Sequence, residues 1–141
     1  MSVQMVLLPV FVLVGLTLAL MVGMIGARRK ALVSGETKIR DIALGQQNWP
    51  VRTTQIGNCY RNQFELPLLF YVLTILAIIS KHADLLFVVM AWIFVLTRLA
   101  HAFVHCTSNN LRVRGAIFGI GALVLAIMWL IFMVRIMLGL P

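Results

Sequence analysis

Two charged side chains lie within runs of sequence that are otherwise apolar. Glu65 stands at the start of one run, and Arg98 lies inside another. A charge near the centre of a membrane-spanning helix costs about 2.5–3.5 kcal/mol on insertion, so it usually faces the bundle interior or a cavity. At helical rise, Glu65 lies about 7 Å and Arg98 about 10 Å from the polar ends of their runs. Because successive helices run antiparallel, these similar depths predict a Glu65–Arg98 pair.

Two further polar residues precede Glu65 at helical spacing. Asn62 is three residues before it and Arg61 is four residues before it. Side chains at these spacings share one helix face, so both residues are predicted to contact the carboxylate. A structural interpretation stays open, because a buried ion pair can serve only to fix helix register. Asn62 can likewise serve only as a hydrogen-bonding residue between helices.

Basic residues continue this pattern after Arg98. His101 and His105 follow it at i+3 and i+7, which places the three on one stripe of a helix. Arg112 and Arg114 stand at the start of the next apolar run. Three helices are therefore expected to direct polar groups to one cavity. The two histidines also have a spacing that suits zinc, but no third ligand of the right type is close in sequence, so we predict no metal site.

A cavity built from arginine, asparagine and glutamate favours one class of ligand. Guanidinium groups bind carboxylates in bidentate geometry, and Glu65 could accept an ammonium group. An arginine beside a thiol also stabilises the thiolate, which is the reactive form. We therefore expect a small zwitterionic ligand that carries several carboxylates. The chain's own cysteines, Cys59 and Cys106, have no C-x-x-C spacing, and we interpret them as reduced packing residues.

The apolar runs that must position these residues are long enough to cross a bilayer. Hydrophobic residues make up 62% of the 141 residues and charged residues only 11%, whereas a soluble domain carries about 25% charged residues. A span needs about 20 residues. We predict an all-α integral membrane four-helix bundle, a single domain over residues 1–141. Its helices are expected at about 5–27, 57–80, 84–105 and 115–138, with a kink at Pro67 in the second.

The distribution of basic residues predicts the orientation. The net charge is +8, with 12 Lys and Arg against 4 Asp and Glu. Most of the basic residues lie in the first and third loops, whereas the second loop holds only Lys81. Basic loops remain in the cytoplasm, so both termini are expected outside. No soluble segment interleaves basic and aromatic residues, so nucleic acid is not an expected partner.

Two blocks of the sequence resemble the MAPEG family (membrane-associated proteins in eicosanoid and glutathione metabolism). The first is Arg61-Asn62-Gln63-Phe64-Glu65-Leu66-Pro67, which is similar to the opening of the family's second helix. The second runs from Arg98 to Arg114 and is similar to the third helix and third loop. The likeness covers about residue 50 to the C-terminus. It is greater to bacterial-type members, which implies a bacterial inner membrane.

The resemblance implies a homotrimer in the lipid bilayer that binds glutathione between neighbouring subunits near the cytoplasmic face. Asn62 and Glu65 would hold the glutathione backbone, and Arg61 and Arg98 would support the site. Either Arg112 or Arg114 would stabilise the thiolate. The remaining implied positions are Arg28 or Arg29, which would bind a carboxylate, and His101 and His105, which stand where glutathione-using members carry tyrosines. Those members also carry an arginine at the position of Asn58.

Three functions compete at this point. The first is a glutathione-dependent transferase or peroxidase that acts on a lipophilic electrophile entering from the bilayer. The second is a membrane protein without catalysis, whose charge cluster locks a trimer or binds another small anionic ligand. The third is a small transporter with Glu65 as its proton site, although a transporter needs access from both sides and these polar residues gather on one side.

Overall fold

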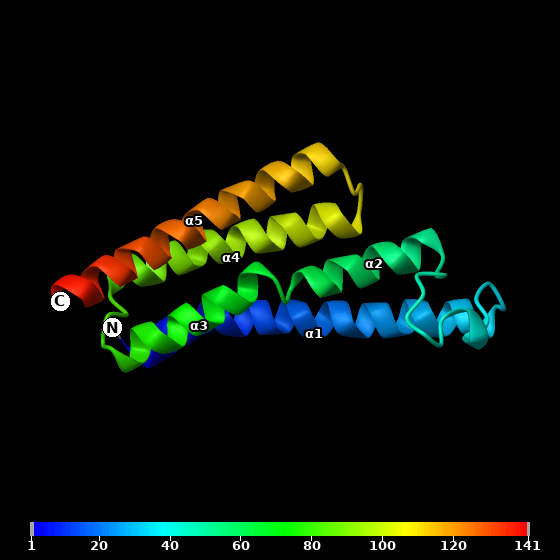
Figure 1. Ribbon diagram of the computed structural model, residues 1–141, viewed down its shortest axis with the longest axis horizontal. Helices are drawn as coiled ribbons and strands as arrows, with labels where there is room; N and C mark the ends of the chain where they lie inside the picture. Colours follow the sequence, from blue (N-terminus) through cyan, green and yellow to red (C-terminus); the bar gives the residue numbers. More distant parts are fainter. Residues whose placement is uncertain (1, 141) are drawn as a thin grey trace.

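The computed structural model describes residues 2–140, which form helices, turns and loops with no β-strand among them. Figure 1 shows an elongated bundle with the two termini at one end. Four segments are long and apolar enough to cross a membrane: Val3–Val33, Val51–Ile79, Leu85–Cys106 and Leu111–Leu138. The first is α1, the third is α4 and the fourth is α5. The predicted all-α four-helix membrane architecture is thereby confirmed.

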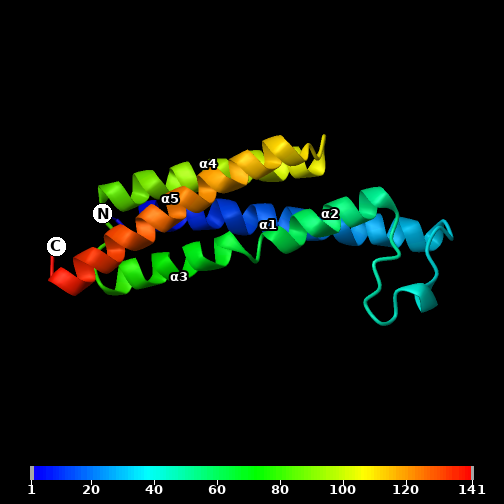
Figure 2. The same cartoon turned by 45° about the horizontal axis from the view of Figure 1, so that its top comes forward.

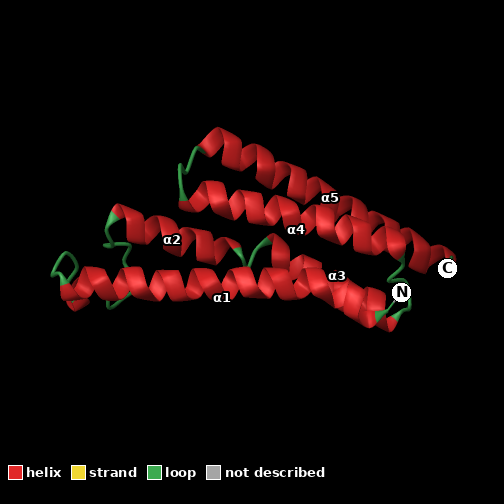
Figure 3. Cartoon of the chain, turned by 180° about the vertical axis from the view of Figure 1, so that it is seen from behind, coloured by secondary structure: helices red, strands yellow, loops and turns green. Residues whose placement is uncertain are grey.

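The second crossing consists of two helices, α2 (Val51–Asn62) and α3 (Leu66–Ile79). The prediction of one continuous helix with a kink at Pro67 is wrong. Helical geometry stops at Gln63–Glu65, and Glu65 has φ −92° and ψ −104°. Pro67 lies in the first turn of α3. A backbone N–H at this position has no intrahelical acceptor, so proline costs no helical hydrogen bond there. Figure 3 shows the break as a loop between the two helices.

A buried side chain closes the end of α2 at this break. The Gln63 side chain is 1% exposed, and its Nε2 donates to the carbonyl oxygen of Cys59 at 3.1 Å. Carbonyl groups in the last turn of a helix have no intrahelical donor, so this amide supplies one. The break is therefore a stabilised feature of the second crossing, and it places Asn62 and Glu65 on either side of a turn.

The helices at the loop end extend further than the apolar runs alone predicted. α1 continues past the expected end at Ala27 to Val33, through basic residues that favour helix. α5 begins at Leu111 instead of Gly115, because the Asn110 side chain accepts from the backbone N–H groups of Arg112 and Val113 at 3.0 and 3.3 Å. This cap places Arg112 and Arg114 inside the helix. Figure 2 shows the first loop, with the short 3₁₀ helix η1 (Ile39–Asp41), beside the C-terminal end of α1.

The α4 helix lies at the centre of the bundle and contacts α1, α2 and α5. Its buried face includes Phe94, whose ring centroid lies 5.0 Å from that of Phe70 on α3. Large apolar side chains on the outer faces are exposed, such as Phe11 at 60% and Leu123 at 62%. An exposed surface of this kind suits hydrocarbon and not water. The chain is an integral membrane protein.

An ion pair joins the start of α4 to the end of α5, near the termini. Asp84 Oδ2 accepts from Arg135 Nη1 at 2.8 Å, and Asp84 Oδ1 caps α4 by accepting from the backbone N–H of Phe87 at 2.9 Å. Burial on its own raises the pKa of Asp84, but the Phe87 N–H and the Arg135 guanidinium together hold it below its usual value. The pair fixes the register of the α4–α5 hairpin at the end opposite the basic loops.

Gly121 of α5 packs closely against Thr97 of α4. A methyl group added to it would lie 2.7 Å from Thr97 Oγ1 and 3.5 Å from Thr97 Cβ. We expect Gly121→Leu to lower the free energy of unfolding by about 2–3 kcal/mol, because overpacking forces the helices apart. Denaturation of the purified protein in detergent measures the change. Gly119→Leu is the matched control, since a side chain there meets nothing within 4 Å; equal stability of the two variants would contradict the prediction.

Candidate functional site

The Asn62 side chain stands between the two charges at the centre of the site. Its Oδ1 accepts from Arg98 Nη2, and its Nδ2 donates to Glu65 Oε2 at 2.6 Å. The predicted direct Glu65–Arg98 ion pair is wrong: within residues 2–140 the ion pairs are Arg40–Asp41 and Arg135–Asp84. Because the helix breaks after Asn62, Glu65 is no longer on the helix face that packs against α4. The Asn62 amide therefore connects the Glu65 carboxylate to the Arg98 guanidinium.

Arg98 is a buried cation whose hydrogen bonds are incomplete. Its side chain is 1% exposed, and its polar contacts are to the Asn62 side chain and, at 3.5 Å, the Asn62 carbonyl. Its Nε and Nη1 have no partner in the described part of the chain. The Phe118 ring from α5 lies 5.7 Å from the guanidinium carbon. A buried charge with free donors is costly unless an anion supplies the missing partners, so Arg98 is suited to bind one.

His101 and His105 continue the buried face of α4 that begins at Arg98, as their spacing predicts. They are 3% and 6% exposed. Their ring centroids are 5.5 Å apart, and His101 also packs against Phe118 at 5.7 Å. The Nδ1 atom of each ring is buried with no hydrogen-bond partner among residues 2–140. Both imidazoles can therefore exchange a proton or a hydrogen bond with a bound molecule.

A cavity of about 220 Å³ opens beside these groups, between the basic ends of α4 and α5. Its walls are formed by Asn62, His101, His105, Leu111, Arg114, Gly115 and Phe118. Pockets that enclose a drug-sized ligand usually measure about 300–1,000 Å³. This cavity is smaller than that range, and its polar lining includes His101 and His105 of α4.

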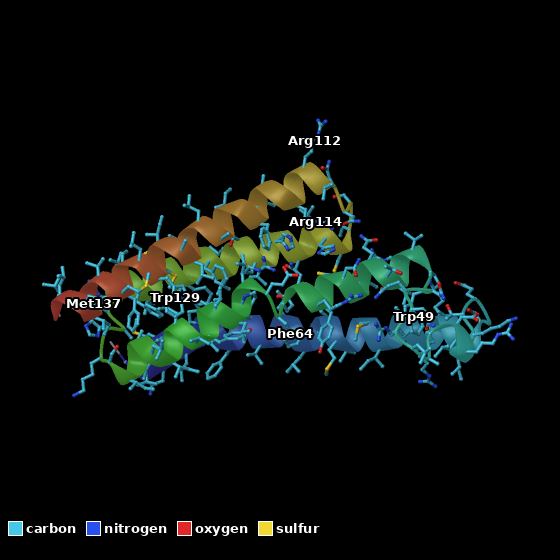
Figure 4. All side chains as sticks on the ribbon, viewed as in Figure 1. Trp49, Phe64, Arg112, Arg114, Trp129 and Met137 are labelled. Carbon is cyan, nitrogen blue, oxygen red and sulfur yellow. The ribbon has the colours of Figure 1, made fainter. Side chains whose placement is uncertain are left out.

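The two arginines that begin α5 are not equivalent. Figure 4 shows Arg114 directed toward α4 and Arg112 directed away from the bundle. Arg114 lines the cavity, and its Nη1 donates to Asn109 Oδ1 at 2.5 Å. Positions two apart on a helix differ by about 200° in direction, so one face can hold only one of them. Of the two arginines, Arg114 is the one that lines the cavity.

Arg61 lies outside the cavity. Its Nη2 donates to Gln47 Oε1 at 3.1 Å and to Asn58 Oδ1 at 3.2 Å. The predicted contact with Glu65 is wrong, because α2 ends before Glu65 and the two side chains no longer share a helix face. Arg61 instead fastens the first loop to α2.

The two arginines near the end of α1 are also separate from the cavity within one chain. Arg28 lies over the Trp49 ring, with its guanidinium carbon 5.0 Å from the centroid, while Arg29 is exposed. Arg28 packs beside Gly57 of α2, where an added methyl group would lie 3.8 Å from its Nη2. Neither residue lines the cavity between α4 and α5.

Sequence reasoning did not identify Phe118 and Asn109 as site residues. Phe118 covers both the Arg98 guanidinium and the His101 ring, and Asn109 holds the Arg114 side chain. Phe118 is four residues after Arg114, a spacing that shares one helix face. That signal was present in the sequence, whereas the Asn109 contact depends on the shape of the α4–α5 turn.

The described residues bring together no group of three metal-ligating His, Cys, Asp or Glu side chains. The polar groups that line the cavity are the Asn62 amide, the two imidazoles and the Arg114 guanidinium, and the amide is bonded in turn to Arg98 and Glu65. Such a set can bind a carboxylate and lower the energy of a thiolate.

Comparison with known proteins identifies a matching family. The sequence model of the MAPEG family matches residues 6–134, a range that contains every residue lining the cavity. No curated protein and no solved structure matches the chain.

Proposed function

The chain belongs to the MAPEG family, and from this premise we propose that it is a membrane-bound, glutathione-dependent transferase or peroxidase for lipophilic electrophiles. The observation that carries the proposal is the buried Arg98 guanidinium, whose Nε and Nη1 lack partners among the described residues. Its hydrogen-bond partner Asn62 lines the cavity, as does Arg114. A buried cation behind a cavity that a second cation lines suits a tripeptide with two carboxylates and a thiol.

The residues of the cavity divide the work of binding and activation. Arg98 would pair with a carboxylate of glutathione, and Glu65, which is exposed and held by Asn62, would accept its ammonium group. Arg114 would stabilise the thiolate after the thiol proton leaves. The thiolate sulfur then attacks the electrophilic atom of the substrate, and the electron pair of the broken bond departs with the leaving group. The electrophile would enter from the bilayer that surrounds the apolar outer faces.

We propose a homotrimer in which a neighbouring subunit closes the open side of the cavity. The small volume of the cavity in one chain supports this assembly. Arg28 and Arg29, which lie away from the cavity of their own chain, would then be placed to bind a carboxylate in the site next door. The basic loops would face the cytoplasm of a bacterial inner membrane, with both termini on the other side.

A second candidate is a different small anionic ligand. The histidines of α4 stand where glutathione-using members carry tyrosines, and Asn58, which bonds to Arg61, stands where they carry an arginine. The two histidines change the donors available in the cavity. Such a protein would still need Arg98 and Arg114 but would not bind glutathione.

Glutathione binding to the purified protein in detergent, measured by calorimetry, tests the proposal. We expect Arg114→Ala to weaken binding by about 10- to 100-fold, since a charge-assisted hydrogen bond contributes about 1.5–3 kcal/mol. Arg112→Ala is the matched control, because the same residue type two positions earlier points away from the cavity. Absence of binding to the wild-type protein at saturating glutathione would overturn the proposal, and equal losses in both variants would exclude Arg114 from the site.

A further inference from the structure

One stripe of α2 is tied to the C-terminal turn of α4. Arg52 Nη1 donates to the carbonyl oxygen of Cys106, and Gln55 Nε2 donates to those of His105 and Thr107 at 2.7 and 3.2 Å. Cys59 follows Arg52 and Gln55 at i+7 and i+4, on the same face of α2. These contacts direct Cys59 toward the last turn of α4.

The thiol of Cys59 reaches the backbone next to Cys106. Its Sγ donates to the carbonyl oxygen of Ala102 at 3.8 Å, and within an α-helix that carbonyl accepts from the N–H of residue 106. The Cys59 thiol and the Cys106 backbone N–H therefore share one carbonyl acceptor in the last turn of α4. Both cysteines are free. Two residues that are distant in sequence and were interpreted as packing residues therefore lie at the same end of α4.

The two thiols differ in access and surroundings. Cys59 is fully buried, whereas Cys106 is half-buried at the end of α4 and has the Arg52 guanidinium on its own carbonyl. A reactive cysteine is usually accessible and close to a cation, and a second cysteine beside it can resolve the oxidised form. Cys106 therefore has the features of the reactive cysteine, and Cys59 has the position of the resolving cysteine.

We propose that Cys106 and Cys59 form a redox-active dithiol that reduces hydroperoxides. The Cys106 thiolate attacks the outer oxygen of the hydroperoxide, the O–O bond breaks, and an alcohol leaves after it takes up one proton. Cys106 is then a sulfenic acid. The Cys59 sulfur attacks the Cys106 sulfur, water leaves, and a disulfide joins α2 to α4. The hydroperoxide is reduced by two electrons and the two thiols are oxidised by two electrons.

This activity goes beyond the proposed transferase or peroxidase, because its electrons come from the protein and not from bound glutathione. The disulfide would also tether α2 within one turn of Asn62, whose amide binds Arg98. Oxidation would therefore fix the α2 side of the cavity in place. Thiols facing the cytoplasm are kept reduced, so the disulfide would be transient and reversible.

Cumene hydroperoxide added to the reduced protein in detergent, without glutathione, tests this inference by intact mass spectrometry. We expect the wild type to lose two hydrogens, to lose both maleimide-reactive thiols and to regain them with dithiothreitol, while it remains monomeric in denaturing, non-reducing gels. Cys59→Ala should stop at a Cys106 sulfenic acid that a cyclic 1,3-dione traps, and Cys106→Ala should not react. A wild type that keeps two alkylatable thiols, or that gains oxygen without a disulfide, would overturn the proposal.

Discussion

Replacing Arg98 by methionine should leave the folded protein about as stable as the wild type while it abolishes the binding of glutathione. The guanidinium is buried, and its Nε and Nη1 have no partner in the described part of the chain. Replacing such a charge by an apolar side chain of similar length is often neutral or stabilising. The same change removes the buried cation that would pair with a ligand carboxylate, a loss of about 2–5 kcal/mol in binding, or roughly 30- to several-thousand-fold in affinity.

Two measurements on one preparation check this expectation. Denaturant unfolding in detergent should give Arg98→Met a free energy of unfolding within about 1 kcal/mol of the wild-type value, because the wild-type charge is itself unsatisfied. Calorimetry on the same sample should show glutathione binding reduced beyond detection. A variant that unfolds readily would instead identify Arg98 as a structural residue that fixes helix register, and a stable variant with normal affinity would remove it from the site.

Asn62→Leu should destabilise the protein by about 3 kcal/mol or more. Asn62 supplies the polar contacts of Arg98 in this structure and also holds the Glu65 carboxylate. Removing one partner of a buried charge leaves that charge uncompensated, which typically costs about 3–5 kcal/mol. The loss should be visible as an earlier unfolding transition in the same denaturant titration.

A double variant separates this mechanism from simple misfit of leucine. In Asn62→Leu with Arg98→Met, no buried charge remains to be satisfied, so most of the lost stability should return. The coupling between the two substitutions should exceed about 1 kcal/mol, as is found for residues in one hydrogen-bonded network. If the double variant is as unstable as Asn62→Leu alone, the damage comes from packing at the helix break and not from Arg98.

The four crossings could be predicted because lipid imposes a simple requirement. Hydrocarbon demands about 20 apolar residues in helical form, and the runs that meet this demand are visible in the sequence. The helix ends were less predictable, because hydropathy does not distinguish a polar helical turn from a polar loop. α1 therefore continues through Arg28 to Val33, and α5 starts at the Asn110 cap. The kink was predicted at Pro67 because proline disrupts helices, whereas the break lies at Gln63–Glu65.

The residue types of the site could also be predicted, but their contacts could not. The stripe of Arg98, His101 and His105 follows from helical periodicity alone. Asn62 bridges Arg98 and Glu65 because α2 ends at Asn62. The spacing of residues in the sequence does not predict where that helix ends. The difference between Arg112 and Arg114 depends on the first residue of α5, since each added residue turns the face by about 100°.

The break in the second crossing has a consequence for how the chain enters the membrane during synthesis. α3 has 14 residues, which at about 1.5 Å each cover about 21 Å, short of the roughly 30 Å hydrocarbon layer. The translocon therefore cannot recognise α3 alone as a complete span, and it must also admit the polar turn of Gln63–Glu65 and part of α2. Asn62, at the end of α2, can bond to Arg98 only after α4 has been synthesised. We therefore expect the second crossing to reach its final arrangement only together with α4.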